Sequence, residues 1–228
     1  MSGDMKNFVK LVLCYLYTDP TIKVKITPQW PDGTYALPMP RGGCPSRWSS
    51  GNRYQDTEDR RNKNRKTLGI EKKMRVDVGR NIRFYYCVKT FQGNSDYQWP
   101  KGSYCIAKKG DCPHGFRYGT IYWDDDDHRI SNKIWGILPD GSYGRDTFVQ
   151  YCCRNDDRYH RPIALPTRKP FILYRSGGRC QRVRGMRTSE LYIKWDDENR
   201  RNDDNCRGSH PDASCHKNQL LHFCYYRR

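Results

Sequence analysis

The sequence contains no stretch of 18 apolar residues, and its hydrophobic residues make up only 36% of the chain. A membrane-spanning helix is therefore not predicted. The sequence also has no helical spacing of apolar residues over a useful length, and no glycine- or serine-rich linker. These absences argue against a helical bundle and against two tethered domains. A chain of 228 residues is long enough for one sizeable core.

Aromatic residues stand where long aliphatic runs are missing. The chain contains 17 tyrosines, 7 phenylalanines and 6 tryptophans. Aromatic side chains favour strands, and each buries a large apolar area, so a low hydrophobic content still permits a packed core. We therefore predict an all-β, antiparallel fold.

Eleven cysteines indicate a disulfide-stabilised protein. Cys14 stands alone near the N-terminus, and ten others follow: Cys44, Cys87, Cys105, Cys112, Cys152, Cys153, Cys180, Cys206, Cys215 and Cys224. An even number suggests a disulfide framework and an oxidising compartment, although the spacing leaves the pairing open. Reduced thiols of a cytosolic protein are the alternative.

The first 29 residues resemble a signal peptide poorly. Lys10 interrupts their apolar patch, Asp4 spoils the basic start, and no A-x-A-like cleavage site follows. The alternating residues 23–27, KVKIT, predict an edge strand within this N-terminal segment, residues 1–29. The cysteine count favours an extracellular location, and the missing signal keeps a cytoplasmic one as the alternative.

Four consecutive aspartates occur in IYWDDDDHR, from Ile121, although the net charge is +17. When the chain is shifted by 72 residues, residues 123–153 fall on residues 195–225 without a gap and with nine identities. A weaker copy begins at Cys44, because CPSRWSSGNRYQDTEDRRNKN aligns with CPHGFRYGTIYWDDDDHRISN from Cys112. The sequence therefore predicts three internal repeat units, at about 30–90, 99–153 and 163–226.

Three further motifs share the pattern Pro-x-Gly: WPDGTY from Trp30, WPKGSY from Trp99 and LPDGSY from Leu138. Proline at the second turn position and glycine at the fourth are typical of a type I turn. Alternating apolar residues flank these motifs, so we expect each to connect the two strands of a hairpin.

An acidic cluster at the same place in each unit favours a role in the scaffold, where aspartates accept backbone N–H bonds and pair with arginines. A calcium site is the next hypothesis, with Asp124, Asp126, Asp196 and Glu198 as ligands, because Ca²⁺ prefers several carboxylates on a loop. The spacing does not fit an EF-hand. A glycosidase-like pair of carboxylates is the third alternative, and adjacent solvated acids do not favour it.

The ordered set of motifs resembles the ApeC family, the C-terminal domain of apextrin. The resemblance rests on WPDGTYALPMPRGGCP (30–45), FYYCVKT (84–90), WPKGSYCIAKKGDCPHGF (99–116), WDDDDHRISN (123–132), GILPDGSYGRDTFVQYCCR (136–154), PIALPTRKPFILYR (162–175), CQRVRGM (180–186) and IKWDDEN (193–199). It implies one ApeC-like domain over residues 30–228, and a role in innate immunity through binding of bacterial peptidoglycan and muramyl dipeptide. A more distant resemblance to vitelline membrane outer layer protein I implies a β-prism-like arrangement of the three units, with a β-sandwich as the alternative.

The residue types suit such a ligand, because sugar rings stack on aromatic rings and carboxylates pair with arginine. Basic residues gather in Arg60–Arg83 and in Arg175–Arg187. The second stretch is interleaved with glycine and suggests either a nest for an anion or a simple hairpin. The candidate ligand-binding residues are Trp123, Arg129, Trp195 and Arg201, which flank the acidic turns. A tryptophan repeated at the end of a strand is more usually part of the core.

Nucleic acid or another polyanion is the rival ligand, given a pI near 9.5, although no known nucleic-acid-binding motif is present. A zinc site from Cys206, Cys215, His216, His222 and Cys224 lacks the usual spacing. Nothing local supports a Cys–His nucleophile, so we do not expect an enzyme. We expect no cofactor apart from the calcium alternative, and an immune signalling partner cannot be named from the sequence.

Overall fold

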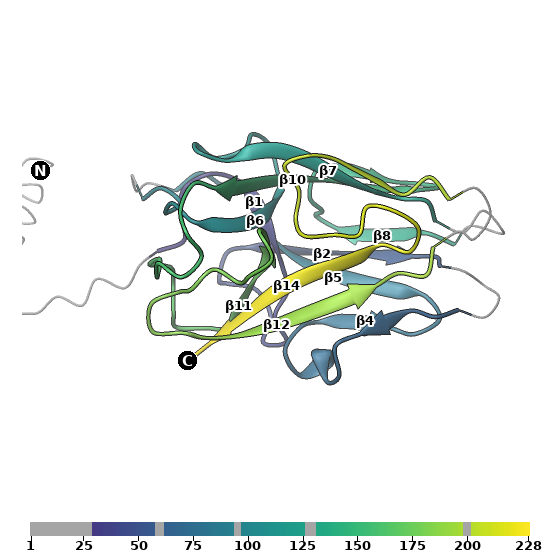
Figure 1. Cartoon of the computed structure of the whole chain (residues 1–228), viewed down its shortest axis with the longest axis horizontal. Helices are drawn as coiled ribbons and strands as arrows, with labels where there is room; N and C mark the ends of the chain where they lie inside the picture. The colour runs from purple at the N-terminus through teal and green to yellow at the C-terminus, as the bar shows by residue number, and fades with distance from the viewer. Residues whose placement is uncertain (1–28, 58–61, 94–96, 126–130, 198–201) are drawn as a thin grey trace, which may run out of the picture.

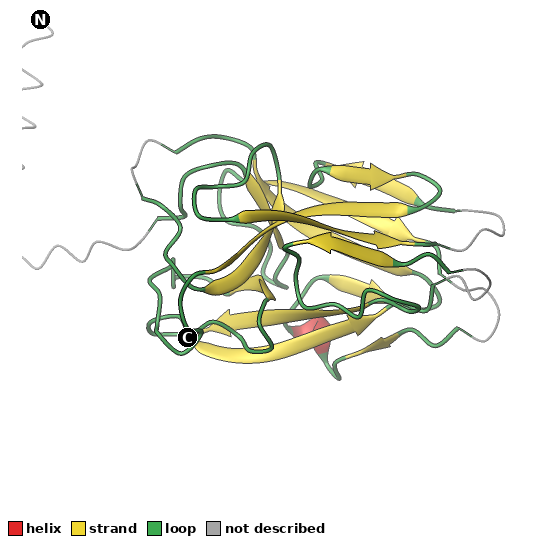
Figure 2. Cartoon of the chain, turned by 45° about the horizontal axis from the view of Figure 1, so that its top comes forward, coloured by secondary structure: helices red, strands yellow, loops and turns green. Residues whose placement is uncertain are grey.

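The computed structural model describes residues 29–57, 62–93, 97–125, 131–197 and 202–228. Cys14, the predicted strand at 23–27, Asp126, Arg129, Glu198 and Arg201 lie outside these ranges. Within them the fold is all-β and antiparallel, as predicted, and the single helical element is the short 3₁₀ turn η1 (Ile70–Lys72) (Figure 2). No helix in the described ranges is long and apolar enough to cross a membrane.

Fourteen strands belong to one hydrogen-bonded network among the described residues. They are β1 (Tyr35–Pro38), β2 (Ser49–Gln55), β3 (Arg65–Lys66), β4 (Val76–Val78), β5 (Ile82–Lys89), β6 (Ser103–Lys108), β7 (Arg117–Trp123), β8 (Lys133–Gly136), β9 (Gly141–Tyr143), β10 (Thr147–Asn155), β11 (Phe171–Arg175), β12 (Arg187–Lys194), β13 (Asn205–Gly208) and β14 (Leu220–Arg227). In Figure 1, β7 and β10 run along the upper side of the molecule, and β12 and β14 run along the lower side.

The same pairing order occurs three times. Set one is β1-β5-β2-β8, set two is β6-β10-β7-β13, and set three is β11-β14-β12-β3. The fourth strand of each set comes from a different predicted repeat unit: β8 from the second, β13 from the third and β3 from the first. The units are therefore interlocked through exchanged edge strands. Their arrangement as faces of a prism stays a prediction, as do the domain boundaries.

The Pro-x-Gly motifs at Trp99 and Leu138 do not connect the two strands of a hairpin, so this expectation was wrong for them. The Trp99 motif lies between β5 and β6, which both pair with β1 and not with each other. The segment before the Trp30 motif lies outside the described residues. The motif at Leu138 lies between β8, which pairs with β2, and β9, which pairs with β10. In all three motifs the tyrosine hydroxyl donates to the carbonyl oxygen of the proline four residues earlier, at Tyr35, Tyr104 and Tyr143. In each motif the turn is thus closed by a hydrogen bond from the motif's own tyrosine, and the chain then enters a strand.

Five disulfides join the ten predicted cysteines, in agreement with a disulfide-stabilised fold. The pairs Cys44–Cys87, Cys112–Cys152 and Cys180–Cys224 occupy equivalent places in the three units, with separations of 43, 40 and 44 residues. The other two are Cys105–Cys153, between in-register residues of β6 and β10, and Cys206–Cys215. The zinc site considered from the sequence loses three of its ligands, because Cys206 and Cys215 are joined to each other and Cys224 is joined to Cys180.

Two clusters of buried side chains form the core. The larger cluster contains Trp123, Trp195, Phe84 and Phe223, together with aliphatic residues from all three strand sets. The smaller cluster gathers Tyr35, Trp99, Tyr104 and Tyr226 with their neighbours. Almost all of the largest fully buried side chains are thus aromatic, as the composition suggested.

Candidate functional site

The acidic turns are three equivalent clasps between the repeat units. The Asp56 N–H donates to Asn132 Oδ1 (2.6 Å), and Asp56 Oδ2 accepts from the N–H of Ser131 (2.8 Å). Asp124 forms the same pair of bonds with Asp204 Oδ1 and the Asp203 N–H, at 2.8 and 2.9 Å. Unit one is therefore tied to unit two, and unit two to unit three.

The third clasp completes the cycle. The Asp196 N–H donates to Asn64 Oδ1 (2.8 Å), and Asp196 Oδ2 accepts from the Lys63 N–H (2.6 Å). Unit three is in this way tied back to unit one. The recurring aspartate is the residue that links each unit to the next, which is the scaffold role that the sequence favoured.

The clasps use the carboxylate oxygens that the calcium hypothesis requires. Oδ2 of Asp124 and Oδ2 of Asp196 each accept a backbone N–H bond. In the described ranges, the one group of side chains close enough to share a metal ion is Cys206, His210 and Cys215, and its two sulfurs are joined in a disulfide. The other two proposed calcium ligands, Asp126 and Glu198, lie outside the described residues.

The aspartate after each clasp points into the core in units two and three. Asp125 accepts bonds from Gln55, Asn132 and Thr147, and burial nevertheless raises its pKa to about 7. Burial also raises the pKa of Asp204 to about 6 and that of Asp197 well above its usual range, and the negative charge of Asp204 raises the Asp197 pKa further. These buried acids serve the scaffold, because they lie away from the molecular surface.

The two candidate tryptophans lie in the core. Trp123 and Trp195 are both 0% exposed, and their rings contact each other with centroids 5.6 Å apart. Neither ring is available to a ligand at the surface. Both tryptophans are part of the core, which was the alternative to ligand binding in the sequence analysis. Arg129 and Arg201 are outside the described residues, and their predicted role stays a prediction.

The glycine-rich basic stretch forms a nest, and the chain's own carboxylate fills it. The N–H groups of Gly177 and Gly178 donate to Asp212 at 3.0 and 2.8 Å, and Arg175 Nε donates to the same carboxylate at 2.6 Å. The same stretch also lines an open groove of about 670 Å³ with Arg179, Arg182 and Arg184, and the lining further includes Tyr159 and Glu190.

A second basic and aromatic surface lies on the outer side of set one. In the strand register, Trp135 of β8, Asn52 of β2 and Tyr85 of β5 form one row. Lys133, Tyr54, Arg83 and Asp77 form the next row, across β8, β2, β5 and β4. Residues paired across strands share one side of a sheet, and the buried Arg53 and Phe84 point to the other side. We call Tyr54, Tyr85, Trp135, Arg75, Arg83 and Lys133 the set-one face.

Aromatic rings and guanidinium groups alternate on the set-one face. The Arg83 guanidinium lies 5.3 Å from the centre of the Tyr54 ring, and the Arg75 guanidinium lies 4.8 Å from that of Tyr85. Trp135 is 66% exposed, whereas the other five tryptophans are buried or half-buried. With neighbouring strands about 4.8 Å apart, a row across four strands extends over about 14 Å.

The sequence predicted part of this face. Arg75 and Arg83 belong to the basic stretch Arg60–Arg83, which was expected either to bind anions or to be a solvated loop. Trp135 was missed. Its position in the repeat holds Arg207 in the third unit, so an aromatic residue there is not part of the repeated scaffold. A tryptophan that breaks the repeat was the signal that could have identified it.

Comparison with known families gives one match. The sequence model of the ApeC family, described as the C-terminal domain of apextrin, matches residues 30–226. No curated protein and no solved structure matches the chain.

Proposed function

The chain belongs to the ApeC family, and from this premise we propose that it is a non-catalytic recognition module of innate immunity that binds bacterial peptidoglycan and muramyl dipeptide through the set-one face. Peptidoglycan presents N-acetylated sugar rings beside peptide carboxylates. A binding surface therefore needs aromatic rings for the sugars and arginines for the carboxylates.

The observation that carries this proposal is the exposed Trp135 in register with Tyr85, beside the Tyr54–Arg83 row. The strands fix the spacing of these side chains, so little conformational entropy is lost when a ligand binds. An open sheet face suits a long polymer better than a closed pocket does. The net charge of +17 adds long-range attraction to the anionic bacterial surface.

The arginine groove supports a second candidate function, binding of nucleic acid or another polyanion. Among the described carboxylates, none forms an ion pair with Arg179, Arg182 or Arg184. Guanidinium groups without an ion-pair partner suit phosphate as well as carboxylate, and such contact weakens as salt is added.

Retention of the purified protein on insoluble peptidoglycan at high salt tests the proposal. Soluble muramyl dipeptide is the competitor, and an anionic polymer on the same support is the control. Retention that muramyl dipeptide competes away supports peptidoglycan recognition. Retention that salt abolishes, or that the polymer matches, supports the polyanion candidate instead.

A further inference from the structure

Residue 53 is an arginine in the core, at a position where the other two repeat units have isoleucine. Arg53 of β2 lies where β7 has Ile121 and β12 has Ile193, because all three residues occupy the same register in their strand sets. Its side chain is 2% exposed, and the guanidinium lies 4.3 Å from the centre of the Trp123 ring. A permanent cation therefore replaces a hydrocarbon side chain at the centre of the fold.

No described carboxylate neutralises Arg53 directly. None lies within 4.0 Å of its guanidinium, and its Nε and Nη1 have no hydrogen-bond partner among the described residues. The buried acid that acts on it electrostatically is Asp125, whose oxygens are bonded to Gln55, Thr147 and Asn132. A buried guanidinium with two nitrogens that lack a hydrogen-bond partner is unfavourable, which favours a further acceptor beside them.

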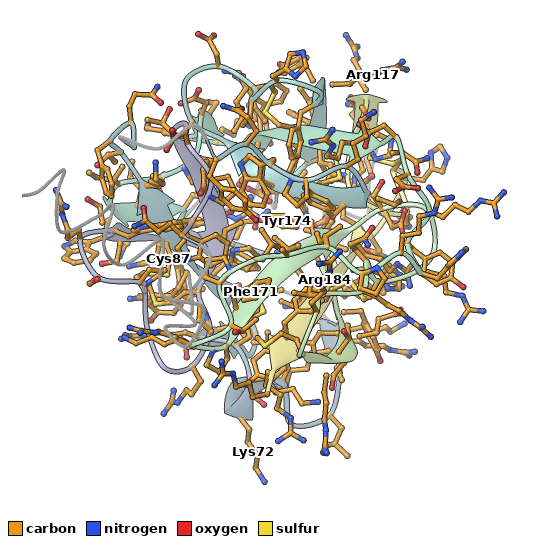
Figure 3. All side chains as sticks on the ribbon, turned by 90° about the vertical axis from the view of Figure 1, so that its left-hand side faces the viewer. Lys72, Cys87, Arg117, Phe171, Tyr174 and Arg184 are labelled. Carbon is orange, nitrogen blue, oxygen red and sulfur yellow. A yellow bond between two sulfur atoms is a disulfide. The ribbon has the colours of Figure 1, made fainter. Side chains whose placement is uncertain are left out.

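Three tyrosine hydroxyls in the same core also have no described hydrogen-bond partner. They belong to Tyr86 of β5, Tyr151 of β10 and Tyr174 of β11, one from each strand set, and all three side chains are buried. The rings of Tyr151 and Tyr174 are 5.1 Å apart, and all three tyrosines are electrostatic neighbours of Arg53. Figure 3 shows Tyr174 near the middle of the molecule, with Lys72 and Arg117 at its periphery.

We propose that Arg53 and the hydroxyls of Tyr86, Tyr151 and Tyr174 bind one small monovalent anion, a halide such as chloride, inside the fold. Guanidinium N–H and phenol O–H groups are donors that point to an acceptor without a proton of its own. A halide satisfies several such donors at once and neutralises the buried charge. Buried water is the competing occupant, because it also bonds to acceptors, and Gln55 Oε1 is an unpaired acceptor on the same strand.

Thermal unfolding at constant ionic strength tests the site. Gluconate, which is too bulky to be buried, is replaced stepwise by chloride or bromide. A ligand that binds only the folded state raises the melting temperature, by about 3–6 °C when its concentration reaches ten times its dissociation constant. An unchanged melting temperature across the exchange would overturn the proposal.

Two variants separate this site from general salt effects. Arg53→Met keeps the length of the side chain without its charge and should abolish the halide response. Arg83→Met removes a surface arginine of the neighbouring strand and should leave the response intact. If Arg53→Met does not fold, Tyr151→Phe should weaken halide binding by at least several-fold. A halide response that persists in Arg53→Met, or one that is undiminished in Tyr151→Phe, would contradict the assignment.

Diffraction from a crystal grown in bromide gives a direct readout. The proposal predicts an anomalous peak within hydrogen-bonding distance of Arg53 Nε or Nη1 and of at least one of the three hydroxyls. Water at that position, without anomalous signal, would overturn it.

Discussion

Asp204 differs from its counterparts in the other repeat units by a single functional group. Units one and two have Asn64 and Asn132 at this position. The Asn132 amide donates to Asp125 Oδ2 at 2.8 Å, whereas the Asp204 carboxyl meets the buried Asp197 carboxyl. Asp197 Oδ1 and Asp204 Oδ2 both lack a described partner, because two carboxylates cannot bond without a proton between them.

We predict that Asp204→Asn stabilises the protein at neutral pH. The folded-state pKa of Asp204 is raised to about 6, above its value in the unfolded chain, so the folded state binds more protons between about pH 4 and 6. Stability from this group is therefore present at low pH and lost as the pH rises through 6. The variant should gain on the order of 1–3 kcal/mol at pH 7.5 in urea unfolding, and less at pH 4.

The reverse change is the matched control. Asn132→Asp would place a second carboxyl against Asp125 in unit two and should destabilise the protein at neutral pH. Equal stability of wild type and Asp204→Asn at pH 7.5 would show that the Asp197–Asp204 pair is not under electrostatic strain.

Single residues were the hardest features to predict from the sequence. The repeat identified Trp123 and Trp195 as equivalent, but their exposure depends on packing between units, which one sequence does not show. The buried position of Arg53 was also unforeseen, because charged residues are almost never buried and its neighbours along the chain are polar.

At the scale of elements, the clasps explain why an acidic turn follows one strand of every unit. Asp196 makes two bonds to the residues just before the exchanged strand β3: its carboxylate accepts from the Lys63 N–H, and its own N–H donates to Asn64 Oδ1. A carboxylate that accepts a backbone N–H contributes about 1–2 kcal/mol when it is partly shielded from water. The clasp therefore fixes the register in which β3, a strand from unit one, pairs with β12 of set three.

We predict that Asp196→Ala lowers the free energy of unfolding by about 1–2 kcal/mol, because the Lys63 N–H loses its acceptor. Hydrogen exchange of the β3 and β12 amides should rise more than that of β7 and β10. Asp111→Ala, at an exposed aspartate, is the control and should change neither quantity. Uniform exchange across all strands in Asp196→Ala would argue against a local clasp.

The strands themselves were largely predictable, and their partners were not. The aromatic-Cys segments FYYC, FVQYC and LLHFC recur near the end of the three predicted repeat units and fall in β5, β10 and β14. The exchange of β3, β8 and β13 between units depends on long-range pairing, for which the local pattern contains no signal. The same limit made the Pro-x-Gly turns look like hairpin connections.

At the scale of the whole molecule, the disulfides divide into a repeated framework and two additions. In the chain-entropy account, closing the 43-residue loop of Cys44–Cys87 is worth about 4 kcal/mol, and the 9-residue loop of Cys206–Cys215 about 2.5 kcal/mol. We predict that replacing both cysteines of Cys44–Cys87 with alanine lowers the melting temperature more than the same change at Cys206–Cys215. The opposite order in calorimetry would show that these crosslinks act chiefly through the folded state.

The set-one face is also a property of the whole molecule, because β8 brings Trp135 from the second unit to the first unit's β2 and β5. From the sequence we expected an aromatic and basic binding surface, but the two tryptophans selected for it, Trp123 and Trp195, are buried. The proposed ligand follows from the family resemblance, and its proposed place follows from the strand register.

The most direct measurement compares two double variants on insoluble peptidoglycan at high salt. Trp135→Ala with Arg83→Ala removes one indole and one guanidinium from the set-one face. Tyr118→Ala with Arg117→Ala removes an exposed aromatic and an arginine from β7 in set two. We predict that the first variant loses at least ten-fold in the retention that muramyl dipeptide competes away, and that the second binds like the wild type. Equal retention of both variants would contradict peptidoglycan binding through the set-one face.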